Sequence, residues 1–185
     1  MDLLNTWYLT RAAGITSYVL LSLSVMSGLY GLVRKKHGQS PGIYPLLHTA
    51  LANWAMYIAM FHVAILFFDQ YTNFTWKDIL VPFATTYKTI PMAIGIIGFY
   101  LLIATILTTE MRNKIGVKIW RKLHMLSPIV YIMVTLHGLW IGTDSKTTGS
   151  FGMYVISIFG VLLLLFLRFK RSRQQVLKYP RGTMN

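Results

Sequence analysis

The chain has 185 residues, of which 55% are hydrophobic and only 12% are charged. Such a composition is too apolar for a soluble domain of this size and favours a membrane protein. Cysteine is absent, which excludes disulfides, cysteine-ligated iron–sulfur clusters and covalently attached c-type haem. The formal net charge is +13, and its meaning depends on how the basic residues are distributed.

Five predominantly apolar segments approach or exceed the roughly 20 residues that cross a bilayer core. They are 12–33, 43–68, 91–107, 117–141 and 151–169. The first follows Arg11 and is longer than the apolar region of a cleavable signal peptide, so we expect a retained helix. The sequence therefore predicts an all-α integral membrane bundle of about five transmembrane helices, multi-pass in the cell membrane.

The basic residues are concentrated on alternate connections. They cluster after the first segment, before the fourth and after the fifth, whereas positive and negative charges balance on the other connections. The positive-inside rule then puts the N-terminus outside, the 34–42 and 108–118 connections in the cytoplasm and the C-terminus inside. Charge segregated in this way argues against a nucleic-acid partner and for membrane lipid.

Short connections predict one bundle rather than separate domains. We expect residues 1–168 to form a single transmembrane domain, and residues 169–185 to form a basic cytoplasmic tail that contacts anionic lipid or a partner. The connection around 69–90 mixes aromatic and polar residues, so we expect it to lie along the outer surface.

Four of the five histidines fall within the predicted spans. His48 and His62 lie on the second span, and His124 and His137 lie on the fourth, which runs in the same direction. At about 1.5 Å rise per residue, the two histidines of each span are roughly 20 Å apart, so they form two pairs at two depths. Burying ionisable groups in a bilayer is costly, and four at matched depths call for a common cause. Opposed imidazoles are strong axial ligands of haem iron, so the pattern predicts two b-type haems.

Helical periodicity fits the second span better than the fourth. On an ideal helix, His62 follows His48 by fourteen residues and so lies within roughly 40° of the same face. His137 follows His124 by thirteen residues and so lies roughly 140° away around the helix. Pro128 lies between them and is a candidate distortion. Any single membrane histidine could instead be an interhelical hydrogen-bonding residue, and His37, in a basic turn, receives no ligand role.

A further pattern comes from the fourth span and from the start of the first. Its residues are Trp120, Leu123, His124, Leu126, Tyr131, Leu136, His137 and Trp140, with Arg11, Gly14, Tyr18 and Leu21. This pattern resembles the ferric reductase-like transmembrane superfamily, which includes NADPH oxidase membrane domains, ferric reductases and the haem-bearing membrane subunit of a bacterial methionine sulfoxide reductase system. The resemblance implies that His48 and His124 ligate the iron of an inner haem, and His62 and His137 that of an outer haem.

The same resemblance implies transmembrane electron transfer to an acceptor outside, by the haem-containing membrane subunit of an oxidoreductase. The chain contains no glycine-rich dinucleotide fingerprint and no βαβ alternation. We therefore expect the electrons to come from a separate cytoplasmic flavoprotein, a bound flavin (FMN or FAD) or a quinol. An acidic donor could dock on the basic inner face.

Several side chains could contact the porphyrins. Candidate partners of the haem propionates are Lys36, Arg121 and Lys122 at the inner level and Arg11 or Lys88 at the outer level. Aromatic residues that could pack on or bridge the porphyrins are Trp54, Phe61, Tyr131 and Trp140.

Two other functions stay open at this point. One is a quinol-linked cytochrome b membrane anchor of a respiratory complex, and the other is a non-enzymatic haem-binding membrane protein. A channel or transporter has little support, because the spans contain almost no carboxylates.

Overall fold

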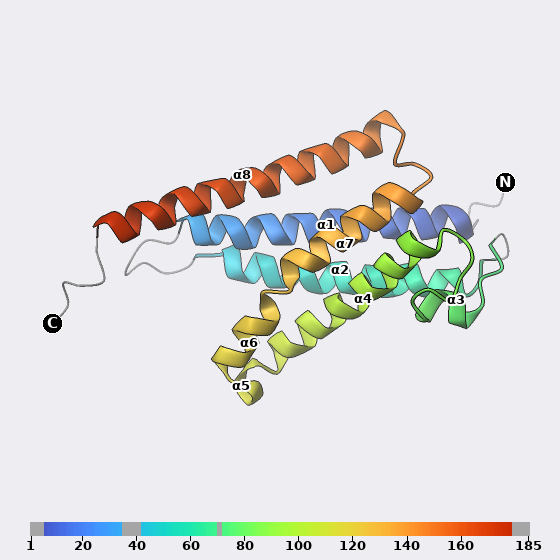
Figure 1. Ribbon diagram of the computed structural model, residues 1–185, viewed down its shortest axis with the longest axis horizontal. Helices are drawn as coiled ribbons and strands as arrows, with labels where there is room; N and C mark the ends of the chain where they lie inside the picture. The colour runs from blue at the N-terminus through green and yellow to red at the C-terminus, as the bar shows by residue number, and fades with distance from the viewer. Residues whose placement is uncertain (1–5, 35–41, 70–71, 179–185) are drawn as a thin grey trace.

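The computed structural model describes residues 6–34, 42–69 and 72–178. Regular structure within these residues is entirely helical (Figure 1). The helices are α1 (Thr6–Arg34), α2 (Tyr44–Leu66), α3 (Trp76–Leu80), α4 (Thr89–Glu110), α5 (Arg112–Ile115), α6 (Val117–His124), α7 (Ser127–Ile141) and α8 (Thr148–Lys178). Within the described ranges, five stretches are long and apolar enough to cross a membrane: α1, α2, α4, α6 with α7, and α8 as far as Arg171. The all-α, multi-pass membrane prediction is confirmed.

The helices α1, α4 and α8 extend beyond the apolar segments that predicted them. In α4, the polar residues Thr108 and Thr109 continue the helix past the apolar segment. Their hydroxyls donate to carbonyl oxygens one turn earlier, at 2.8 Å each. The helix α8 runs on to Lys178, so the first part of the predicted 169–185 tail is helical. Near its end, the guanidinium of Arg171 donates to the carbonyl oxygen of Val33, in the last turn of α1. A cation at a helix C-terminus satisfies an otherwise unpaired carbonyl.

Two helix pairs form the centre of the bundle. The helix α1 packs along α2, and α4 packs along α7; α1 also contacts α7 and α8, and α4 contacts α2 and α6. In Figure 1, the start of α1 lies at the same end as α3, whereas α5, α6 and the end of α8 lie at the opposite end. Each of the two histidine-bearing segments, α2 and α6–α7, is therefore supported by a neighbouring helix, α1 or α4.

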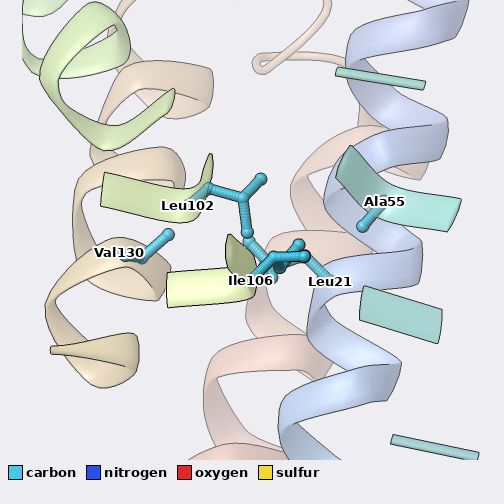
Figure 2. Close-up of a cluster of buried hydrophobic side chains, with 5 residues drawn as sticks. All are labelled: Leu21, Ala55, Leu102, Ile106 and Val130. Atoms are coloured by element: carbon cyan, nitrogen blue, oxygen red, sulfur yellow. The ribbon is translucent and has the colours of Figure 1, made fainter. Parts of the chain in front are cut away.

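The four central helices meet in an aliphatic cluster (Figure 2). It contains Leu21 from α1, Ala55 from α2, Leu102 and Ile106 from α4, and Val130 from α7. Many large apolar side chains lie on the outside of the bundle instead. This distribution suits a protein surrounded by lipid, because the acyl chains are as apolar as the side chains that face them.

The fourth span is interrupted between its two histidines. The helix α6 ends at His124 and α7 begins at Ser127, with Pro128 in its first turn. Proline has no backbone N–H and fits the first turn of a helix, where that group would be unpaired. The interruption lies where the sequence indicated a distortion, so His124 and His137 do not belong to one ideal helix.

The connection between α2 and α4 folds across one end of the bundle. The short helix α3 begins with a capping box, in which Thr75 and Asp78 bond each other's backbone N–H groups. Hydrogen bonds from the Thr75 hydroxyl and backbone hold the pKa of Asp78 below its usual value. The hydroxyl of Tyr100 donates to the carbonyl oxygen of Leu80 at 2.6 Å, which fastens α3 to α4.

Candidate functional site

The four histidines of the spans meet in two pairs. The ring centroids of His48 and His124 lie 5.9 Å apart, and His124 is the last residue of α6. His62 and His137 line a common cavity. The structure thus brings together the same two pairs that the depth argument predicted.

The cavity at His62 and His137 is bounded by α1, α2, α4 and α7, and by Ile79 of α3. Apart from these two histidines and Ser17, its lining consists of glycine and apolar side chains, among them Met92 and Phe99. An apolar cavity with a few convergent polar groups is the usual form of a cofactor site. Its composition suits a flat apolar ring with an imidazole on either side.

Backbone carbonyl groups fix the orientation of three histidine rings. The Nδ1 atom of His48 lies 2.8 Å from the carbonyl oxygen of Ser24. The Nδ1 atom of His62 lies 2.7 Å from the carbonyl oxygen of Thr10, and that of His137 lies 2.8 Å from the carbonyl oxygen of Pro91. A carbonyl oxygen only accepts, so each Nδ1 carries the hydrogen and donates it. In a neutral imidazole the Nε2 atom is then unprotonated, which is the form that binds a metal ion.

The Ser24 hydroxyl adds a second link to His48. It donates to the carbonyl oxygen of His48 at 2.8 Å and lies 3.0 Å from the Nδ1 atom of the same residue. Its oxygen can therefore share the Nδ1 hydrogen with the Ser24 carbonyl. Ser24 is almost completely buried, so this link joins α1 and α2 inside the bundle.

His124 is held differently from the other three. Its Nδ1 atom is buried and has no hydrogen-bond partner among the described residues. Its ring stacks instead on Trp120, with centroids 5.2 Å apart and planes inclined by 27°. The indole Nε1 of Trp120 donates to the hydroxyl of Thr109 at 3.2 Å, so α4 supports this histidine through a tryptophan rather than through a carbonyl group.

A glycine on the neighbouring helix faces each carbonyl-bonded ring. A Cβ atom at Gly28 would lie 3.0 Å from Nδ1 of His48, one at Gly14 would lie 3.1 Å from Cε1 of His62, and one at Gly95 would overlap the ring of His137. From the sequence, Gly14 stood out only as part of a motif, and Gly28 and Gly95 were not predicted. One signal was available: Gly14 and Gly28 have the same fourteen-residue spacing as His48 and His62.

The donor set fits haem better than a free metal ion. No group of three or more histidine, cysteine, aspartate or glutamate residues lies close enough to hold a metal ion in the described part of the chain. A porphyrin supplies four equatorial nitrogens, so haem iron needs only a pair of axial ligands. With metal–nitrogen bonds of about 2 Å, two opposed imidazoles have ring centroids roughly 6 Å apart, which the 5.9 Å between His48 and His124 matches.

The candidate propionate contacts differ in their surroundings. Arg121 and Lys122 are exposed on α6 beside His124. Arg11 forms an ion pair with Asp144 and lies over the ring of Trp7, 3.9 Å from its centroid, so its charge is already engaged. Lys36 lies outside the described residues.

Lys88 and the four candidate aromatic residues either make other contacts or lie on the surface of the bundle. The Nζ atom of Lys88 donates to the carbonyl oxygen of Trp140 at 3.2 Å. Trp54, Phe61 and Trp140 are exposed on the surface of the bundle. The hydroxyl of Tyr131 hydrogen-bonds to Ser157 of α8, and its ring belongs to a cluster with residues of α1 and α8.

Comparison with known families identifies one match. Residues 13–135 match the family described as the ferric reductase like transmembrane component. The matched range covers well over half of the chain and includes His48, His62 and His124, while His137 lies just beyond its end. No curated protein and no solved structure matches the chain significantly.

Proposed function

The chain belongs to the ferric reductase-like transmembrane family, and we propose that it carries single electrons across the membrane through two b-type haems. His48 and His124 would hold one haem, and His62 and His137 the other. The observation that carries the proposal is the pairing of imidazoles at two depths, with three of the four rings presenting an unprotonated Nε2.

The bound haem iron would supply reversible one-electron oxidation and reduction. Because two imidazoles occupy both axial positions, they leave no coordination site for a small substrate. The histidines thus favour conduction of electrons over chemistry on a ligand at the iron. This makes the chain the electron-carrying membrane subunit of an oxidoreductase.

The aliphatic cluster separates the two levels. Ala55 lies seven residues from both His48 and His62, and Leu21 lies seven residues from both Gly14 and Gly28. These side chains and their neighbours fill the space between α1, α2, α4 and α7 (Figure 2). They exclude water from the path between the levels, which lowers the local dielectric constant and keeps protons out.

The charge distribution supports a direction of transfer. The helices α5 and α6 carry Arg112, Lys114, Lys118, Arg121 and Lys122, at the end of the bundle where His48 and His124 meet. Under the positive-inside rule this end is cytoplasmic. We propose that the donor, a separate flavoprotein, a bound flavin or a quinol, delivers electrons here, and that the acceptor lies on the outer side. Complementary charge would speed the docking of an acidic donor protein.

Vesicles with a trapped acceptor test the proposal. The full chain, purified with its haem, is reconstituted into liposomes that contain ferricyanide, and an impermeant reductant is added outside. We expect the trapped ferricyanide to be reduced only in vesicles that contain the haem-bound protein. We expect His48→Ala and His62→Ala each to abolish the reduction. His37→Ala is the matched control and should behave as the wild type. Unimpaired transfer in both the His48→Ala and the His62→Ala variant would refute the proposal.

A further inference from the structure

We infer that Gly14, Gly28 and Gly95 are positioning residues that lock three of the four ligand histidines, and that the two haems consequently differ in reduction potential. The inference rests on the proposed function, because it assigns a role to residues around the haem ligands. None of the three glycines would touch the iron. Each acts through the imidazole ring that lies against it.

The three contacts share one geometry. Each histidine donates to the carbonyl oxygen of the residue four positions before a glycine: Thr10 before Gly14, Ser24 before Gly28, and Pro91 before Gly95. In an α-helix that oxygen also accepts the N–H of the residue four positions later. The glycine and the imidazole therefore share one acceptor, whose two lone pairs can serve both donors.

The absent side chain is what allows the approach. A methyl group at Gly28 or Gly14 would come to 3.0 or 3.1 Å from the imidazole of His48 or His62, and one at Gly95 would overlap His137. Any other residue would push the ring away from the shared carbonyl oxygen. By contrast, a methyl group at Gly98, one turn further along α4, would meet Met133 at 3.4 Å, an ordinary van der Waals distance.

The arrangement on α1 and α2 is repeated in antiparallel register. Gly14 faces His62 and Gly28 faces His48, so both residue pairs are fourteen positions apart along their helices. Fourteen residues are close to four helical turns, which returns each pair to nearly the same face. One helix thus provides the same support at both levels.

His124 breaks this pattern. Its Nδ1 atom has no hydrogen-bond partner among the described residues, and its ring rests on Trp120. A histidine that donates its Nδ1 hydrogen to a carbonyl group is a more basic ligand than one that does not. A more basic ligand stabilises ferric iron and lowers the reduction potential. The haem between His62 and His137, with both rings bonded, should have the lower potential, and the haem between His48 and His124 the higher.

Alanine variants of the glycines test the assignment in the haem-loaded full chain. Redox titration of the haem absorbance bands and electron paramagnetic resonance (EPR) of the oxidised protein are compared for Gly14→Ala, Gly28→Ala and Gly95→Ala. Gly98→Ala is the matched control on α4. We expect Gly14→Ala and Gly95→Ala to raise the lower potential and alter one ferric signal, with the larger effect from Gly95→Ala. Gly28→Ala should raise the higher potential and alter the other signal.

The outcomes separate this inference from the proposed function. If Gly95→Ala does not fold with haem, the milder Gly14→Ala and Gly28→Ala variants decide, since their added methyl groups would come no nearer to the imidazole than 3.0 Å. If Gly14→Ala and Gly28→Ala each contain two haems with the potentials and spectra of Gly98→Ala, the inference is overturned and the proposed function still stands. A wild-type protein without haem would overturn both.

Discussion

The imidazole rings of His48 and His124 face each other almost perpendicularly, at an interplanar angle of 86° and a centroid separation of 5.9 Å. When two axial imidazoles are perpendicular, their π orbitals act equally on the two iron d orbitals that they overlap. Those orbitals then stay close in energy, and the ferric haem gives an EPR spectrum of large g anisotropy. We expect one such signal from the oxidised protein, and we expect His124→Ala to remove it. A strongly anisotropic signal that survives this substitution would show that another pair produces it.

Trp120 should determine how firmly the haem that we propose beside His124 is held. Its ring stacks on His124, and the guanidinium of Arg112, on α5, lies 5.0 Å from the centroid of the Trp120 ring. An aromatic contact of this kind contributes about 0.5–1.5 kcal/mol beyond the buried area. We expect Trp120→Leu to lower the temperature at which one of the two haems is released, and Trp120→Phe to lower it less.

Thr109 provides the control for that prediction. Thr109→Val removes the acceptor of the Trp120 Nε1 hydrogen but keeps the indole ring. If the hydrogen bond orients the ring, this variant should fall between the wild type and Trp120→Leu. Equal haem-release temperatures in all three variants and the wild type would contradict a supporting role for Trp120.

A buried hydroxyl network joins α1, α7 and α8. The oxygen of Ser157 lies 3.0 Å from the hydroxyl of Tyr18, 2.6 Å from that of Tyr131 and 3.0 Å from that of Ser22. Ser157→Ala would leave two phenol groups without this partner in an apolar interior. Because hydrogen bonds between membrane helices contribute about 0.6 kcal/mol on average and up to about 1.7, we expect a loss of stability of that order.

Unfolding of the protein in mixed micelles measures this loss. Thr108→Ala is a suitable control, since among the described residues its hydroxyl bonds to carbonyl groups of its own helix. We expect Thr108→Ala to change the free energy of unfolding less than Ser157→Ala does. The reverse order would mean that the network does not hold α8 against α1.

Arg11 and Asp144 tie the start of α1 to the connection between α7 and α8. Their side chains are 22% and 28% exposed, so solvent only partly screens the ion pair. A double-mutant cycle with Arg11→Gln and Asp144→Asn should give a coupling energy of about 1 kcal/mol that falls as salt is added. A coupling near zero, together with loss of haem in Arg11→Gln alone, would assign Arg11 to a haem propionate instead.

The sequence was sufficient to predict the spans and the pairing of depths, because the bilayer imposes both. Apolar length defines a transmembrane helix, and the rise per residue converts the spacing of His48, His62, His124 and His137 into depth. The position of Pro128 also indicated the interruption between α6 and α7 that the structure contains.

The supports of the histidines could not be predicted in the same way. The acceptors for His48, His62 and His137 are backbone carbonyl groups, which every residue possesses and which no side-chain pattern marks. Which carbonyl group meets which ring depends on the register of two packed helices. The stack of Trp120 on His124 likewise depends on where α6 ends. For the same reason, sequence spacing did not reveal that α8 packs along α1.

Haem content per chain tests the central claim most directly. A pyridine haemochrome assay on the purified full chain, with spectra of the oxidised and dithionite-reduced protein, counts b-type haem. We predict two low-spin haems per wild-type chain, one in the His62→Ala, His137→Ala double variant, and none when His48 and His124 are also replaced by alanine. A wild-type protein without haem, purified from haem-replete cells, would contradict the claim, and so would two haems retained by the double variant.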